Sequence, residues 1–179
     1  MSVRIEELEP DGWRRWRDVR SRALALDPAA FACSAHQLGP EAPESRWRER
    51  IAAPGAILLA VDDDGRDIAM VGLSTAGAPE LISMWVAPEA RHRGIGRVLV
   101  DAVIARAGSR PLSLRVMAEN AGAIAFYAGC GFELAGREPD DEGTLTMRRA
   151  APSAATAWPA PAERPHRPGA SRPGRSVDQ

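Results

Sequence analysis

The stretch from Met84 to Arg97, Met-Trp-Val-Ala-Pro-Glu-Ala-Arg-His-Arg-Gly-Ile-Gly-Arg, decides the fold. An apolar strand is predicted to end here in a short basic turn with two glycines, and an amphipathic helix follows at once. A residue without a Cβ atom lets a ligand approach the backbone closely. The unpaired N–H groups at a helix N-terminus attract anions. The stretch therefore predicts a phosphate-binding turn.

Arginine side chains would strengthen such a site. Arg91, Arg93 and Arg97 carry full charges, and guanidinium groups suit phosphate oxygens. The same pattern also fits a tight strand-to-helix turn in which the arginines serve only solubility. Two common phosphate motifs are excluded, because G-x-G-x-x-G needs a glycine where Leu99 stands and G-x-x-x-x-G-K-[ST] needs a lysine, which the chain lacks.

A second informative block runs from Leu112 to Glu133 and predicts a strand, a turn with an asparagine, a short helix and another strand. Together the two blocks resemble the GNAT superfamily of acyl-CoA-dependent N-acyltransferases. The family patterns R-x-x-G-x-G and N-x-x-A-x-x-x-Y-x-x-x-G-F occur here in the family's order and spacing. The matching residues are Arg91, Gly94 and Gly96 in the first, and Asn120, Ala123, Tyr127, Gly131 and Phe132 in the second.

The resemblance implies a fold and a co-substrate. The expected fold is α/β (α+β), with a mixed, mostly antiparallel central sheet flanked by helices, over residues 1–149. The expected co-substrate is acetyl-CoA, with no metal. In the family the central strand bonds the pantetheine arm through its main chain and splays from the next strand. The coenzyme-binding residues implied are Trp85, Val86, Arg91, His92, Arg93, Gly94, Ile95, Gly96, Arg97, Asn120 and Ala123.

The resemblance also implies a general acid. Tyr127 is the only tyrosine, and family members often use its equivalent to protonate the leaving thiolate. Its plainer role is packing beside Phe126. Asn120 either bonds the pantetheine amides or caps the following helix, for which asparagine is well suited.

The general base is the open question. Glu80, at the start of the central strand, is our first candidate, and Glu119 is the second. Exposed glutamates are common, so a solvated surface acid is the plainer interpretation of both, and more so of Glu119. His92 sits in the phosphate turn, so a phosphate contact or simple exposure suits it better than catalysis.

The acceptor is expected to be a primary amine of a small molecule. Ribosomal-protein N-terminal alanine acetyltransferases, which resemble this chain, use a glutamate where Arg115 stands, and arginine cannot act as a base. Residues 26–47 are expected to line the acceptor side with aromatic and acidic groups that suit a cationic amine. The candidates are Phe31, Cys33, Ser34, His36, Glu41, Glu44 and Trp47.

Two other functions remain open. One is acetylation of a protein N-terminus or lysine, and the other is a non-catalytic module that senses acyl-CoA. Neither cysteine stands with a histidine in a recognisable nucleophile arrangement, so direct transfer is expected rather than an acyl-enzyme.

Composition supports a single enzyme domain. The chain has 179 residues, 45% of them hydrophobic, and a formal net charge of −1. The near-neutral charge disfavours a nucleic-acid partner, and the chain has no apolar run long enough to cross a membrane. A cytoplasmic location and a possible homodimer are expected. Residues 150–179 are rich in Pro, Ala and Arg, which predicts a disordered tail.

Periodicity and turn residues predict the remaining elements. Asp11 is expected to cap the first helix, and Asp27-Pro28 to end it. The sequence Asp62-Asp63-Asp64-Gly65 predicts a hairpin turn. The predicted strands are 3–8, 57–61, 68–74, 81–86, 112–116, 132–135 and 144–147, and the predicted helices are 12–26, 43–53, 95–107 and 121–128.

Overall fold

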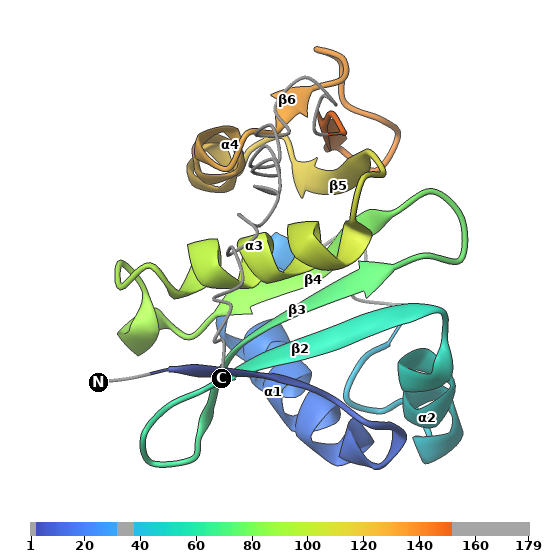
Figure 1. Cartoon of the computed structure of the whole chain (residues 1–179), viewed down its shortest axis with the longest axis vertical. Coiled ribbons are helices and arrows are strands. Elements are labelled where there is room, and N and C mark those ends of the chain that lie inside the picture. The colour runs from blue at the N-terminus through green and yellow to red at the C-terminus, as the bar shows by residue number, and fades with distance from the viewer. Residues whose placement is uncertain (1–2, 32–37, 152–179) are drawn as a thin grey trace, which may run out of the picture.

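A computed structural model describes residues 3–31 and 38–151 (Figure 1). One seven-stranded sheet has the order β1-β2-β3-β4-β5-β7-β6, and only the β4–β5 pair is parallel. Helices flank it, which confirms the predicted fold class. The strands are β1 Arg4–Glu7, β2 Gly55–Val61, β3 Asp67–Ser74, β4 Glu80–Val86, β5 Leu112–Met117, β6 Glu133–Leu134 and β7 Thr144–Arg149. The helices are α1 Trp13–Leu26, α2 Glu44–Ala52, α3 Ile95–Ala107 and α4 Ala121–Gly129, with short 3-10 turns η1 Pro10–Gly12, η2 Pro28–Phe31 and η3 Pro88–Ala90.

The hairpin between β2 and β3 forms where the aspartate run predicts it. The Asp62 carboxylate accepts hydrogen bonds from the backbone N–H groups of Asp64 and Arg66. Gly65 adopts φ 79°, in the left-handed region that glycine tolerates. The turn therefore fixes the register of the pair on which the rest of the sheet is built.

The prediction that Asp11 caps α1 is wrong. Residues 10–12 already form the 3-10 turn η1, so the residue before α1 is Gly12, which makes no side-chain cap. The Asp11 side chain is fully exposed and lies 3.8 Å from Arg48 of α2. The chain was therefore helical one turn earlier than the capping rule assumed.

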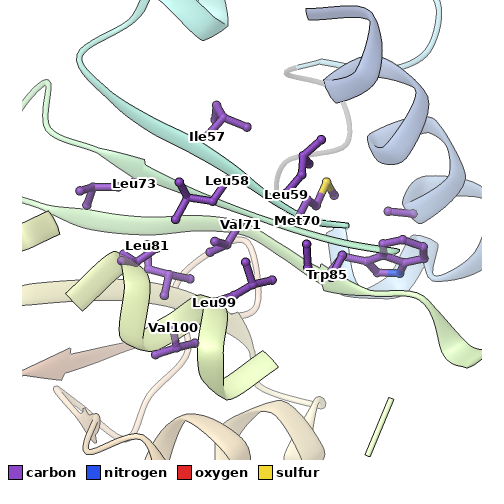
Figure 2. Packing of buried hydrophobic residues seen from close by; sticks show 14 of the residues in the cluster. Ile57, Leu58, Leu59, Met70, Val71, Leu73, Leu81, Trp85, Leu99 and Val100 are labelled. Carbon is purple, nitrogen blue, oxygen red and sulfur yellow. The ribbon is translucent and has the colours of Figure 1, made fainter. Parts of the chain in front are cut away.

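Helices pack on both faces of the sheet. Neighbouring strand residues alternate between the faces, and Leu58 pairs with Val71 while Leu59 pairs with Met70. Figure 2 shows Leu58 and Val71 on the side of Leu99 from α3, and Leu59 and Met70 on the side of α1. The core is thus two apolar layers separated by the sheet.

The centre of the sheet is split. β4 pairs with β5 only at Glu80↔Ser113 and Leu81↔Leu114, whereas β3 accompanies β4 along its length. Beyond Leu81 the edge of β4 that faces β5 is therefore open. In Figure 1, β1 to β4 run together on one side of α3, and β5 and α4 lie on the other. This is the splay that the family resemblance implies.

Ser83 introduces a bulge at the start of the open edge. It adopts φ 54°, which is unusual for a residue with a side chain. The register of the β3–β4 pair shifts there, between Met70↔Trp85 and Gly72↔Ile82. Such bulges redirect a strand and often lie beside functional sites.

Several sequence predictions fall on residues outside the described ranges. Cys33, Ser34 and His36 lie there, as does almost all of the predicted tail. Within the described ranges, no helix is both long and apolar enough to cross a membrane. The same residues hold no cluster of three His, Cys, Asp or Glu side chains suited to a metal ion.

Candidate active site

A cavity of about 670 Å³ lies at the split between β4 and β5. Its walls come from α1, η2, α2, residues 80–84 of β4, the end of β5 and α4. Four predicted site residues line it: Glu80, Asn120, Ala123 and Tyr127. Segments that are far apart in sequence therefore meet around one space at the open edge of β4.

Tyr127 lies on the α4 wall of the cavity. The residue is 8% exposed, and its ring packs against Phe126 and Phe132 with centroid distances of 5.2 and 5.9 Å. Burial raises the pKa of the phenol well above its ordinary value of 10. The hydroxyl therefore stays protonated at neutral pH, as a proton donor must.

Asn120 acts as the cap of α4. Its side-chain oxygen accepts a hydrogen bond from the Ala123 N–H at 3.0 Å. Of the two roles left open by the sequence, capping is therefore the one that the structure displays. Because the Ala123 N–H is bonded to this cap, Ala123 contributes its side chain, and not its N–H group, to the cavity wall.

The basic turn before α3 has the geometry expected of an anion site. Gly94 precedes the helix with φ 78° and supplies no side-chain cap. The first intrahelical bond runs from the Val98 N–H to the Gly94 carbonyl, at 3.1 Å. The N–H groups of Ile95, Gly96 and Arg97 are thus left without acceptors inside the helix.

Gly96 is needed for packing at this helix end. A Cβ atom there would lie 3.2 Å from the Phe126 ring and 3.3 Å from the Met84 methyl group. Because Met84 also lines the cavity, the helix N-terminus adjoins the cavity's end. The missing Cβ lets α3 approach α4 closely, a role that the sequence argument gave only to a ligand.

Trp85, which is predicted to bind the coenzyme, has a side chain that packs inside the protein. It is 4% exposed and pairs with Met70 of β3, and its indole N–H donates to Asp27 at 2.7 Å. Ala87 N–H bonds to β3, so alternation turns the main chain of Trp85 toward β3 and that of Val86 toward the open edge. We therefore assign Trp85 to packing.

The arginines of the turn are engaged within the protein. Arg91 donates to Asp27 at 2.6 Å and to the Val86 carbonyl at 3.0 Å. Arg97 pairs with Asp101 of its own helix and donates to the Gly129 carbonyl at 2.8 Å. These arginines add positive potential near the turn, and their hydrogen bonds tie the turn to neighbouring segments. His92 adopts φ 60° and is exposed.

The two candidate bases are placed differently. Glu80 lines the cavity and is half-buried, whereas Glu119 is exposed and is not part of the lining. Arg50 of α2 also lines the cavity and interacts electrostatically with Glu80. Burial lowers the pKa of the Arg50 guanidinium.

The expected acidic lining on the acceptor side is wrong. Glu41 and Glu44 are exposed and lie outside the lining, and Trp47 is fully buried in the core. Phe31 does line the cavity as expected. The charged side chains of the lining are Arg20, Arg46, Glu49, Arg50, Glu80 and Arg115, so arginine predominates.

Sequence reasoning missed Arg50, although a signal was present. Arg46, Glu49 and Arg50 follow an i, i+3, i+4 spacing that puts them on one face of α2, and all three line the cavity. Trp47 of the same helix is fully buried in the core. On an amphipathic helix, the polar side chains that flank a buried apolar residue usually face solvent, so this pattern does not by itself indicate a cavity wall.

The sequence profile of the Acetyltransferase (GNAT) family matches residues 16–132, which is more than half of the chain. The chain belongs to this family. Membership confirms the resemblance drawn from the two motifs and the expected enzyme class, an acyltransferase. The match spans the cavity walls from α1 to α4.

Individual relatives agree at different levels. A mycothiol acetyltransferase from Clavibacter michiganensis is 34% identical over 80 residues, which are 45% of this chain and 26% of that protein. The chain thus matches about a quarter of that relative's length. Two solved structures share the fold at 21% identity. A phosphinothricin acetyltransferase from Sinorhizobium meliloti in complex with AcCoA has a TM-score of 0.66 over 84% of this chain and 89% of its own. The ribosomal-protein-S18-alanine N-acetyltransferase from Escherichia coli has a TM-score of 0.64 over 88% and 99%.

Proposed function

We propose that this protein is an N-acetyltransferase that moves an acetyl group from acetyl-CoA directly to the primary amine of a small molecule. One observation carries the proposal. The open edge of β4 leads from the N-terminus of α3 to a cavity lined by both Glu80 and Tyr127. A thioester carbonyl on this edge would lie between a base and an acid.

The residues divide the work as follows. The N–H groups of Ile95, Gly96 and Arg97 bind the pyrophosphate of the coenzyme, as helix N-termini bind anions. The open-edge main chain of β4, including Val86, bonds the pantetheine arm. A main-chain N–H near the Ser83 bulge donates to the oxyanion that forms on the carbonyl, a contact type that typically contributes about 3–4 kcal/mol.

The transfer itself needs two proton movements. The nitrogen of the neutral amine forms a bond to the carbonyl carbon, and Glu80, directly or through water, takes a proton from that nitrogen as the bond forms. The tetrahedral intermediate collapses, the carbon–sulfur bond breaks, and Tyr127 protonates the departing thiolate. Burial keeps the Tyr127 phenol protonated at neutral pH, so its proton is available, although the raised pKa makes the phenol a weaker acid than a free tyrosine.

Two features support a small acceptor. The cavity is of a size usual for small-molecule sites. Arg115, at the place where the alanine N-acetyltransferases carry a glutamate, is paired with Asp140 and Glu142. A fixed cation there cannot deprotonate a peptide N-terminus. No acyl-enzyme is needed, because an acid and a candidate base already line the cavity.

The test is coenzyme thiol release from acetyl-CoA with a panel of amines that includes polyamines, amino acids, aminoglycosides and N-terminal peptides. Tyr127→Phe should lower acceptor-dependent release at least about tenfold, since general acid catalysis contributes roughly 10²–10⁴. Glu80→Gln should lower it as well, whereas Glu119→Gln, a matched change outside the cavity, should not. Unchanged release in Tyr127→Phe would remove the proposed acid, and coenzyme binding without release would favour a sensor.

A further inference from the structure

The wall of the cavity formed by α2 contains a charged group without a direct partner. Arg50 is half-buried, and within residues 3–31 and 38–151 it makes no hydrogen bond and no ion pair within 4 Å. Its interaction with Glu80 acts only at longer range. Placing a charge out of water without a partner is unfavourable, so a counter-group from outside the chain would offset this.

A second unsatisfied donor lies in the same lining. The indole N–H of Trp16 is fully buried and has no hydrogen-bond partner in the described part of the chain. Both groups are donors, and neither can accept a hydrogen bond. What these two donors lack is an acceptor within hydrogen-bond reach, and for a guanidinium the best acceptor is an anionic oxygen pair.

The other arginines of the lining already have acceptors. Arg115 pairs with Asp140 and Glu142, and Arg46 lies 3.7 Å from Glu49 at the exposed rim. Arg20 donates to the Leu38 carbonyl and to Ser83. Arg50 is therefore the guanidinium of the lining best suited to receive a ligand.

From this arrangement we propose that the acceptor is an amine that carries a carboxylate close to the amino group, such as a free amino acid. Its carboxylate binds Arg50 and its amine lies against Glu80. This inference rests on the proposed function and narrows its acceptor class. It replaces the cationic amine expected from the sequence, because Glu41 and Glu44 lie outside the cavity.

The two charges are complementary to such a molecule. Arg50 projects from α2 and Glu80 begins β4, so a positive and a negative group face one space from different walls. A zwitterion places its own opposite charges at a short, fixed separation. A polyamine would instead bring further positive charge beside Arg50, which like-charge repulsion disfavours.

The test compares each of several L-amino acids (alanine, methionine, glutamate and phenylalanine) with its amino-acid amide as acceptor. The amide keeps the side chain and amine but has no carboxylate. Its amine is also less basic, so chemistry alone favours it at neutral pH. The readout is the ratio of kcat/KM for acid over amide in the intact chain.

We expect the wild type to favour the acid for at least one pair. Arg50→Ala should reduce that ratio by about tenfold or more, mainly through KM, because a charge-assisted hydrogen bond is lost. Arg50→Lys, which keeps the charge, should restore part of the preference. Arg48→Ala, on the same helix and outside the lining, is the matched control and should leave the ratio unchanged.

Three results would overturn the inference. The amides could be used as well as the acids, or the preference could survive in Arg50→Ala. Arg50→Ala could also lower kcat for acids and amides equally, which would mean that Arg50 only tunes Glu80. All three leave the acetyltransferase intact. Failure of the proposed function gives a different result, namely no thiol release with any acceptor, and the inference falls with it.

Discussion

The Arg20 guanidinium donates to Ser83 Oγ at 3.2 Å and so ties helix α1 to the bulge of β4. Arg20 is 3% exposed and also donates to the Leu38 carbonyl at 2.9 Å. Ser83 adopts φ 54° and lies where the register of the β3–β4 pair shifts. A buried cation therefore supports the place where the sheet begins to open.

Removing the Ser83 hydroxyl should destabilise the protein. In Ser83→Ala, a charged buried donor loses an acceptor, which should lower the free energy of unfolding by about 1–3 kcal/mol. Ser83→Gly loses the same oxygen but relieves the positive φ, and should be more stable than Ser83→Ala by about 1 kcal/mol. Urea unfolding measures both. If Ser83→Ala were the more stable of the two, the strained bulge would be contradicted.

Gly96→Ala should weaken coenzyme binding. The added methyl group would lie 3.2–3.3 Å from Phe126 and Met84, and overpacking of this kind costs about 1–3 kcal/mol. To relieve this contact the start of α3 must move, and its first N–H groups move with it. The Kd of CoA measured by calorimetry should therefore rise. Gly96→Ala combined with Phe126→Leu should recover part of the loss. Equal affinity in Gly96→Ala and wild type would show that close helix packing there is unimportant.

The chain's single tyrosine allows its titration to be observed directly. Burial raises the folded-state pKa of Tyr127 above 10, so tyrosinate absorbance in the folded protein should appear only at higher pH. The contribution of protonated Tyr127 to the free energy of unfolding is complete below pH 10. It is lost as the pH rises further, because the tyrosine of the unfolded chain releases its proton first. Tyr127→Phe removes this loss. A folded-state titration at or below pH 10 would refute the buried acid.

Asp140 should stabilise the protein above pH 3.8 and make its stability fall in stronger acid. Hydrogen bonds from Thr144 lower the carboxyl pKa from 3.8 to about 2, with further help from the N–H of Glu142 and the charge of Arg115. The folded-state pKa is depressed, so this contribution is present above pH 3.8 and disappears as pH falls through about 2. Asp140→Asn should flatten the acid limb of the stability curve. Asp141→Asn, at the neighbouring exposed position, should follow the wild type.

Arg50 should contribute little to stability. Arg50 has no ion pair among the described residues and is partly removed from water. Arg50→Met should therefore leave the free energy of unfolding unchanged or raise it by up to about 1 kcal/mol, and the melting temperature should follow. Arg115→Met, which breaks pairs with Asp140 and Glu142, should lower it. A large loss in Arg50→Met would mean that Arg50 is structural.

The sequence predicted the fold well because its signals were local. The aspartate–glycine turn, the glycine before α3 and the asparagine cap each act within a few residues, and each appears where expected. Asp11 failed because a 3-10 turn had already begun, which the capping pattern does not reveal.

The walls of the cavity were harder to predict because they depend on distant contacts. Nothing local indicates that Asp27 would bind both Trp85 and Arg91, which are separated from it by 58 and 64 residues. Arg50 resembles any exposed arginine on a polar helix face until β4 is placed opposite it. Glu41 and Glu44 are close in sequence to residues that line the cavity, but they are not part of its lining.

The most direct measurement of the central claim is the mass of the acceptor after incubation with the full chain and acetyl-CoA. The proposed chemistry requires that the amount of acetylated amine equals the amount of thiol released. It also requires that the rate of acetylation falls at least about tenfold in Tyr127→Phe. Coenzyme bound by the protein with no acetyl group appearing on any amine would contradict it.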